Sequence, residues 1–286
     1  MPTAAIISKP QKTELCEILA ELLDWFAARG YECVLDPESA GYLNRRDDAV
    51  ERSEMARFKP EICVTLGGDG TLLSAARAFA QTDAPILGCN LGSLGFLTEV
   101  PLGELFATLQ AWKDGKAYID LRHMMHAELL RPNQPPREWL ALNDVVLSKG
   151  AIARMGEFMV ELDGEFVARF RADGVIVATP TGSTAYTLAA AGPILIPSLD
   201  AMVLTAICPH LLTIRPIVVP GQSEITVTVD VVQHETYLTV DGQEAVELLL
   251  NDKIRCRRSE RCVKLLRLRP NGIFNVLRSK LSWGEQ

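Results

Sequence analysis

The sequence lacks several features that would define other classes of protein. No stretch approaches the roughly 18 uninterrupted apolar residues that a membrane helix needs. The N-terminus has no basic region followed by a long apolar run, which argues against a secretory signal. The seven cysteines include no C-x-x-C pair, so we expect reduced thiols in a cytoplasmic protein without a structural zinc site. His123 and His126 lie three apart in a predicted strand, where they would point to opposite faces, so no protein-bound metal is expected.

An excess of basic residues is also absent. Lys and Arg number 29 against 36 Asp and Glu, and the formal net charge is −7. A general nucleic-acid binder needs a clustered basic surface, so we expect neither a nucleic-acid partner nor, given the short apolar runs, a membrane partner. The Arg-rich residues 255–261 are interpreted as a solvated turn between two strands.

Apolar strands and amphipathic helices alternate over the first 115 residues. Partly β-branched apolar runs predict strands at residues 4–8, 32–35, 61–66 and 85–89. Apolar residues at i, i+3, i+4 and i+7 predict a helix from Leu15 to Phe26, and further helices are expected at residues 71–80 and 102–112. Residues 44–59 are interpreted as a loop or a surface helix. This alternation predicts an α/β domain with a parallel sheet over residues 1–115.

After about residue 115 the pattern changes, which predicts a second, β-rich domain over residues 116–267. Period-two alternation predicts strands at residues 118–130, 139–147, 158–162, 166–170, 175–178, 225–232 and 237–240. The pairs Asp163-Gly164 and Asp241-Gly242 predict hairpins, and the Pro-rich residues 131–136 predict a hairpin tip. One helix is expected near residues 183–191.

Residues 67–71, Gly-Gly-Asp-Gly-Thr, lie where a predicted strand ends and a helix begins. Glycines there allow positive φ and close approach of a ligand, and the N–H groups of the turn and helix start can bind phosphate oxygens. Asp69 would repel a phosphate, so we interpret it as the partner of a hydroxyl group or a metal ion. The sequence contains neither the Walker A pattern nor G-x-G-x-x-G, and the protein-kinase motifs are absent.

Two further segments combine polar groups with apolar surroundings. Asn143 and Asp144 interrupt an apolar strand, which fits either a bulge or turn or a ligand site, because such a pair is costly to bury without hydrogen bonds. Residues 173–186, DGVIVATPTGSTAY, predict a strand, a turn rich in Thr, Gly and Ser, and a helix start. The many donors of this turn, together with Tyr186, favour a ligand site over a plain helix cap.

In this order, the segments resemble the NAD kinase family over nearly the whole chain. The family's motifs match at residues 67–71 (GGDGT), 90–97 (N-L-G-x-L-G-F-L), 143–144 (Asn-Glu, here Asn-Asp), 173–186, 209–216 (P-H-x-L-x-x-R-P) and 241–243 (D-G-Q). The GGDGT turn is shared with diacylglycerol, sphingosine and phosphofructo-kinases, whereas the block at residues 173–186 is far more specific.

The resemblance implies an N-terminal α/β domain, a β-rich C-terminal domain, and a last segment, residues 268–286, that packs back on the first. It implies transfer of the γ-phosphoryl group of ATP to the 2′-hydroxyl of the adenosine ribose of NAD. Mg²⁺ or another divalent cation would accompany ATP, and the enzyme would be a homodimer or homotetramer.

The resemblance also implies roles for single residues. Asp69 is the expected catalytic carboxylate, which aligns the ribose hydroxyl and takes its proton late, and Gly70 is expected to contact the dinucleotide. Asn143 and Asp144 match dinucleotide contacts, although Asp144 is one methylene shorter than the family's Glu. Positions near the phosphates and the nicotinamide half are Arg154, Arg171 and Asp173. Adenosine-side contacts are Thr184, Ala185, Tyr186, Thr187, Leu188 and Ala189, and a further ligand contact is Gln243.

Two other classes remain open at this point. A lipid or sugar kinase would share the GGDGT turn but lack the block at residues 173–186. A non-catalytic NADP-binding sensor would keep the dinucleotide residues but would have no reason to keep Asp69.

Overall fold

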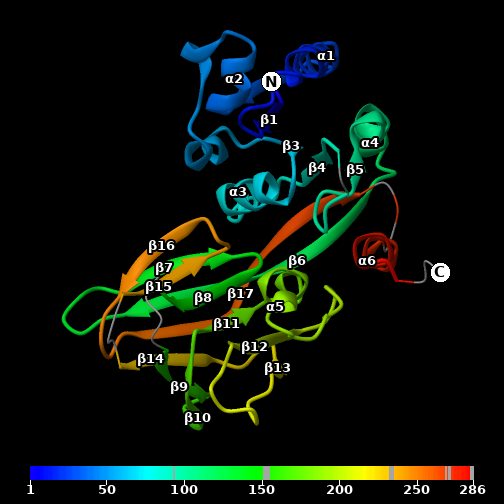
Figure 1. Cartoon of the computed structure of the whole chain (residues 1–286). Helices are drawn as coiled ribbons and strands as arrows, with labels where there is room; N and C mark the ends of the chain where they lie inside the picture. The colour runs from blue at the N-terminus through cyan, green and yellow to red at the C-terminus, as the bar shows by residue number, and fades with distance from the viewer. Residues whose placement is uncertain (93, 151–154, 232–234, 268, 270–271, 284–286) are drawn as a thin grey trace. The chain divides into compact units, whose positions relative to one another are not determined.

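The computed structural model describes residues 1–92, 94–150, 155–231, 235–267, 269 and 272–283, and the chain divides into two compact units. The first unit comprises Met1–Leu121 and Val263–Gln286, and the second comprises Arg122–Cys262. Strand β6 (Tyr118–Leu130) carries the chain out of the first unit, and β17 (Lys253–Arg267) carries it back (Figure 1). The second unit is therefore an insertion in the sequence of the first.

A parallel sheet forms the centre of the first unit, as predicted. Strand β1 (Thr3–Ser8) pairs in parallel with β2 (Glu32–Leu35) and with β3 (Ile62–Gly67), and β3 pairs in parallel with β4 (Ile86–Asn90). Beyond β4 lie the short β5 (Val100–Pro101) and the end of β17, where Leu265 pairs with Ile86. The α-helices are α1 (Leu15–Ala27), α2 (Pro37–Tyr42), α3 (Asp69–Phe79), α4 (Leu105–Lys113) and α6 (Ile273–Leu281).

Helix α1 shows why the apolar spacing was informative. Leu15, Leu19, Leu22 and Phe26 are all buried, and they pack in one cluster with the apolar side chains of β1, β3 and β4. The charged residues of α1 lie on the opposite face, so the helix is held by its apolar stripe rather than by end caps, of which its N-terminus has none from a side chain.

Residues 44–59 contain two 3-10 helices, η1 (Arg46–Asp48) and η2 (Arg52–Phe58), and a third, η3 (Leu102–Glu104), precedes α4. Helix α2 was not predicted. It is specified by Asp36, whose carboxylate accepts a hydrogen bond from Ser39 N at 2.9 Å, and by Pro37 in the first turn. Among the described residues, no helix is both long and apolar enough to cross a membrane.

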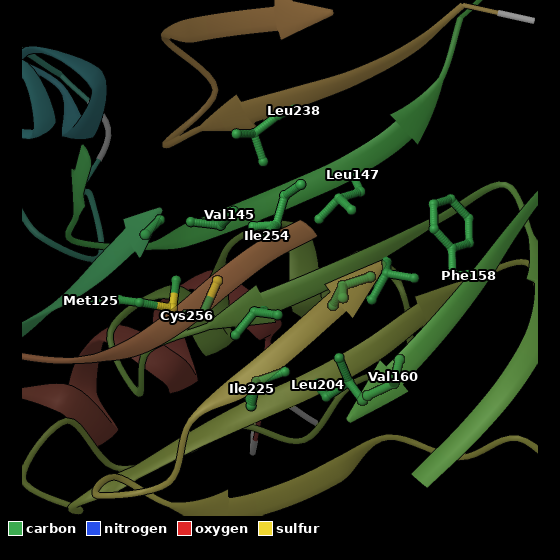
Figure 2. Close-up of a cluster of buried hydrophobic side chains, with 14 of the residues drawn as sticks. Met125, Val145, Leu147, Phe158, Val160, Leu204, Ile225, Leu238, Ile254 and Cys256 are labelled. Atoms are coloured by element: carbon green, nitrogen blue, oxygen red, sulfur yellow. The ribbon is translucent and has the colours of Figure 1, made fainter. Parts of the chain in front are cut away.

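The second unit is a sandwich of antiparallel strands. One sheet has the order β13-β12-β11-β8-β15-β16, and the facing strands include β6 and β7 as well as the run β10-β9-β14-β17. Figure 2 shows Val145, Leu147 and Leu238 of the first sheet in one cluster with Phe158, Val160 and Ile225 of the facing strands. The strands are β7 (Arg137–Ala141), β8 (Asp144–Lys149), β9 (Gly156–Leu162), β10 (Glu165–Ala172), β11 (Gly174–Ala178), β12 (Ala201–Ile207), β13 (Ile217–Pro220), β14 (Ile225–Val231), β15 (Thr236–Val240) and β16 (Glu244–Leu248).

The predicted hairpins are confirmed. Asp163 and Gly164 have φ of 52° and 82° between β9 and β10, and Asp241 and Gly242 have φ of 50° and 63° between β15 and β16. Two consecutive residues with positive φ form a type I′ turn, whose backbone twist matches the twist of the flanking strands. Residues 131–136 join the antiparallel strands β6 and β7, as expected.

Two predictions about local structure were wrong in part. Residues 139–147 are not one strand, because β7 ends at Ala141 and pairs with β6, whereas β8 begins at Asp144 and pairs with β11 and β15. The helix near residues 183–191 is reduced to the 3-10 helix η4 (Gly182–Thr184) and the short α5 (Tyr186–Ala189). The backbone of Ala185, with φ −94° and ψ −125°, separates these two pieces.

The Arg-rich residues 255–261 are not a turn, which overturns the interpretation from composition. They lie inside β17, where the buried Ile254 and Cys256 alternate with charged neighbours. Arg255 and Arg257 lie 3.4 and 3.1 Å from the carboxylate of Glu128, a buried residue of β6. Cross-strand ion pairs therefore account for the basic residues in this strand.

Phe26→Ala tests the core of the first unit. Phe26 is fully buried, so the variant is expected to lose about 3–5 kcal/mol of unfolding free energy through lost burial and a residual cavity. Phe58→Ala is the matched control, since Phe58 is 41% exposed in the same unit and should lose much less. Urea denaturation measures both, and similar losses would contradict this assignment of the core.

Candidate active site

The GGDGT turn joins β3 to α3 at the carboxyl end of the parallel sheet. Gly68 precedes the helix in extended conformation, and Asp69 is its first residue. Beside the turn lies a cavity of about 280 Å³, lined by Lys9, Pro10, Arg52, Gly68, Gly70 and Thr71. Two cationic side chains and the start of an eleven-residue helix thus border one cavity within the first unit, an arrangement that suits phosphate groups.

The glycines of this turn act differently from the expectation. None of Gly67, Gly68 and Gly70 has a positive φ, so the prediction of a left-handed turn was wrong. A Cβ added at Gly67 would clash with Thr71, whereas one added at Gly68 or Gly70 would meet no atom within 4 Å. Glycine therefore keeps the backbone of the cavity wall bare, and the turn itself needs no special dihedral.

Asp69 holds residues 95–98, the end of the second glycine-rich segment, in place. Its Oδ1 accepts hydrogen bonds from Leu97 N, Thr98 N and Thr98 Oγ1, each at 3.0 Å. Its Oδ2 accepts one from Phe96 N at 2.9 Å. A Cβ at Gly95 would clash with the Asp69 carboxylate, which explains the glycine there. The carboxylate is thus positioned by three consecutive backbone N–H groups, and Oδ2 keeps capacity for a further donor.

Arg52 was not predicted as a site residue from the sequence. A buried partner fixes its guanidinium group beside the cavity. Asp36 is fully buried, and its Oδ2 accepts hydrogen bonds from Arg52 Nε and Nη2 at 2.8 and 2.7 Å. The guanidinium also donates to Ser8 O and to Ser74 Oγ. These bonds orient the guanidinium before any ligand binds, because its rotamer is set by four hydrogen bonds to three protein acceptors.

In the second unit, the Asn143-Asp144 pair contacts the Thr-rich turn. Thr179 Oγ1 donates to Leu142 O at 2.6 Å, and Thr179 N donates to Asn143 O at 2.9 Å. A Cβ at Gly182 would clash with the Asn143 carbonyl, so this turn needs glycine for close backbone approach. The structure therefore brings together two motifs that lie about 40 residues apart in sequence.

Asp144 is an unusual acid in this setting. Burial of its carboxyl group, followed by the negative charge of Asp241, raises its pKa to about 7, while a hydrogen bond from Tyr186 N acts in the opposite direction. The side chain of Tyr186 is 45% exposed and remains accessible for stacking.

The other predicted residues of the second unit fall into two groups. Thr184, Ala185, Thr187, Leu188 and Ala189 lie with Tyr186 in the segment that runs from η4 to α5, and Gln243 follows the Asp241-Gly242 turn. Asp173 lies at the other end of β11, where it forms an ion pair with Lys149 at 2.7 Å.

Register separates the two groups. Gly174, next to Asp173, pairs with Ser148, and Ala178 pairs with Asp144. About 14 Å of β11 therefore lies between the group near Asp173 and the group near Asp144. Arg171 is exposed near Asp173, and Arg154 lies outside the described residues. Asp69 and Gly70 belong to the first unit.

Three residues near these motifs were missed from the sequence. Lys9 and Arg52 line the cavity although they precede the GGDGT turn by 58 and 15 residues, and Lys149 pairs with Asp173 across neighbouring strands. Only Lys149 had a local signal, as a charged residue at the end of an apolar strand.

His123 and His126 point to different neighbours along β6, as their spacing predicts. His123 Nδ1 lies 3.1 Å from Cys262 Sγ, whereas His126 Nε2 lies 3.2 Å from Glu138 Oε2. His126, Glu128 and Glu138 bring ligand atoms within 4.8 Å of one another, but Arg255 and Arg257 already neutralise Glu128.

The first unit is a parallel α/β fold with a glycine-rich, cation-lined cavity, and a β-sandwich is inserted in its sequence. These features define a class of two-unit phosphate-handling proteins. Comparison with known proteins narrows this class. The ATP-NAD kinase N-terminal domain model matches residues 4–117, and the ATP-NAD kinase C-terminal domain model matches residues 142–268. The chain therefore belongs to the NAD kinase family.

Individual relatives agree with this assignment. An NAD kinase of Acidobacterium capsulatum is 54% identical over the full length of both chains, and one of Koribacter versatilis is 49% identical over the full length of both. A crystal structure of yeast NADH kinase complexed with NADH matches with a TM-score of 0.90 and 26% identity, covering 100% of this chain and 89% of that one.

Asp144→Asn is expected to stabilise the protein at alkaline pH. Because the folded pKa of about 7 lies above the ordinary 3.8, the stability linked to protonated Asp144 is full below pH 3.8 and is lost as pH rises through about 7. That difference corresponds to about 4 kcal/mol at most, which the neutral amide would regain at pH 8.5 but not at pH 4. Thermal melts at both pH values measure the effect, with the exposed Asp47→Asn as control. An equal change in stability at both pH values would show that the pKa of Asp144 is not raised in the folded protein.

Proposed function

We propose that the protein is an NAD kinase that transfers the γ-phosphoryl group of Mg-ATP to the 2′-hydroxyl of the adenosine ribose of NAD, forming NADP. The observation that carries this proposal is the pairing, in one chain, of a cation-lined GGDGT cavity with the Asn143-Asp144 junction and the block at residues 173–186. A general GGDGT kinase needs only the first of these features. The full-length relatives named NAD kinase and the yeast enzyme solved with NADH support the same acceptor.

In this proposal the cavity beside the GGDGT turn receives the phosphates of ATP. Lys9 and Arg52 border the cavity, and the bare backbone at Gly68 and Gly70 allows close approach. Mg²⁺ or another divalent cation arrives with ATP as part of the substrate and neutralises phosphate charge. Asp69 is poorly suited as its main ligand, since Oδ1 is already occupied by three hydrogen bonds.

Asp69 is proposed as the catalytic carboxylate. Its Oδ2 would accept a hydrogen bond from the ribose 2′-hydroxyl and align that oxygen with the γ-phosphorus. As the new P–O bond forms and the bond to the ADP oxygen breaks, the hydroxyl proton passes to the carboxylate. A carboxylate is a weak base for an alcohol, so the proton moves late and alignment is the larger contribution.

The dinucleotide is proposed to lie on the second unit and on Gly70. Asn143 and Asp144 would bind ribose hydroxyls, with the six residues Thr184 to Ala189 and Gln243 on the adenosine side. Arg154, Arg171 and Asp173 would serve the phosphates and the nicotinamide half. The separation of about 14 Å along β11 supports this division, because an extended dinucleotide has two distant ends.

We also propose a cytoplasmic homodimer or homotetramer. All seven cysteines are free thiols, which suits a reducing compartment. In the second unit Phe166, Ile217 and Val218 are 64%, 41% and 48% exposed, and a cavity of about 300 Å³ lies beside Val167 and Ile217. Apolar groups gathered in this way suit an interface between copies of the chain.

The activity itself is tested directly. Incubation with NAD and Mg-ATP should yield NADP, detected with an NADP-specific dehydrogenase, and no product should form with diacylglycerol or sphingosine as acceptor. A sensor would bind NADP without turnover. Absence of NADP at high enzyme concentration would reject the proposal.

Asp69→Asn should lose turnover by roughly 100- to 10,000-fold, because the amide neither accepts all the hydrogen bonds that position the carboxylate nor takes the proton. Thr98→Val is the control, since it removes one hydrogen bond to Asp69 Oδ1 while leaving the carboxylate. It should cost about 1 kcal/mol of stability without a comparable loss of turnover. Near-normal turnover of folded Asp69→Asn would show that Asp69 is not catalytic.

Lys9→Met should raise KM for ATP about tenfold and leave KM for NAD nearly unchanged, because a charge-assisted bond to phosphate is lost. Lys12→Met, three residues along, removes an exposed ammonium that pairs with Glu14 and serves as control. Steady-state kinetics with each substrate varied measure both constants. Equal effects on the two KM values would place the ATP phosphates elsewhere.

A further inference from the structure

One carboxylate, that of Asp241, holds the junction where the chain passes from β7 to β8. Its Oδ2 accepts a hydrogen bond from Leu142 N at 3.0 Å, and its Oδ1 accepts from Asn143 N at 2.7 Å and Asp144 N at 3.1 Å. Asp241 N donates to Asp144 O at 2.9 Å. Asp241 lies about 100 residues along the chain and is 7% exposed.

Together with Thr179, this contact satisfies the whole backbone of the junction. The three N–H groups of Leu142, Asn143 and Asp144 go to Asp241, and their three carbonyl groups accept from Thr179 Oγ1, Thr179 N and Asp241 N. A peptide fixed at all six polar groups has no backbone freedom left. What it presents is the half-buried side chain of Asn143 and the carboxyl group of Asp144.

The turn that carries Asp241 does not by itself require an acid. Asn and Gly suit its positive φ at least as well as Asp does. Three converging N–H donors, by contrast, require a group that only accepts, which is a carboxylate and not an amide. The residue is therefore specified by the junction rather than by the hairpin.

Asp241 also acts on the junction through its charge. It faces Asp144 from the β15–β16 turn, while α5 offers Asp144 the opposing backbone N–H of Tyr186. Burial raises the pKa of Asp144 most, and the charge of Asp241 is the second cause that raises it toward neutrality. A carboxylate accepts hydrogen bonds from ribose hydroxyls better than the protonated acid does.

We propose that Asp241 is a positioning residue for the dinucleotide, which holds Asn143 and Asp144 in their binding geometry and makes dinucleotide affinity depend on pH in the neutral range. This inference rests on the proposed function, because it takes Asn143 and Asp144 as dinucleotide contacts.

Asp241→Asn is the direct test. NAD affinity and kcat/KM for NAD are measured from pH 5.5 to 8.5, with KM for ATP alongside. Affinity for NAD should fall about tenfold or more, because the amide cannot accept three N–H groups, and KM for ATP should stay within about twofold. The acidic limb of the kcat/KM profile should move to lower pH, since Asp144 loses a negative neighbour.

Asp163→Asn is the matched control. Asp163 occupies the equivalent Asp-Gly turn between β9 and β10, with φ 52°, and its Oδ1 accepts from Glu224 N at 2.7 Å. It should leave NAD affinity and the position of the limb as they are in the unchanged protein.

Two further variants separate position from charge. Asp241→Glu keeps the charge but adds a methylene, so it should weaken NAD binding and leave the limb in place. Asp144→Asn should remove the limb altogether. These two variants carry the test if Asp241→Asn does not fold.

An unmoved limb in folded Asp241→Asn, or equal losses of NAD and ATP affinity, would overturn the inference, as would a limb that survives Asp144→Asn. Failure of the proposed function shows separately, since the unchanged protein would then make no NADP.

Discussion

Three consecutive backbone N–H groups converging on one carboxylate is the interaction on which both candidate binding regions depend. Asp69 receives the N–H groups of Phe96, Leu97 and Thr98, and Asp241 receives those of residues 142–144. These N–H groups donate to the carboxylate rather than to a neighbouring strand, so without it several of them would be left unpaired at considerable cost. Each carboxylate thus accepts the hydrogen bonds that a neighbouring strand would otherwise accept.

This arrangement explains how acids can lie among groups suited to phosphate. A carboxylate that accepts three or four hydrogen bonds is stabilised as an anion by local dipoles, and its field toward solvent is correspondingly reduced. Arg52 shows the reverse case, since the fully buried Asp36 offsets its charge while fixing its direction. The site is therefore built from charges whose orientation is settled by the fold before any ligand arrives.

Local patterns predicted those parts of the structure that local physics determines. The four parallel strands and α1 follow from apolar spacing, and the two Asp-Gly hairpins follow from positive φ. The continuous strand predicted at residues 139–147 and the turn predicted at residues 255–261 were wrong because each region depends on a partner far along the chain, Asp241 for the first and Glu128 for the second. The alternative of a bulge or turn at Asn143 agrees with the bend between β7 and β8. The site motifs were recognisable by their order. The hydrogen bond from Asn143 N to Asp241 was not, because its donor and acceptor lie almost 100 residues apart.

The insertion of the second unit into the first has a consequence for the order of assembly. Strand β17 pairs with β4 through Leu265 and Ile86, so the parallel strands of the first unit gain this partner only after the rest of the second unit has been synthesised. Until β17 emerges, the part of β4 at Ile86 and Leu87 lacks the strand that pairs with it there, and an open strand edge is a place where strands of other chains can pair. Because β17 also pairs with β14 of the sandwich, one late strand completes both units.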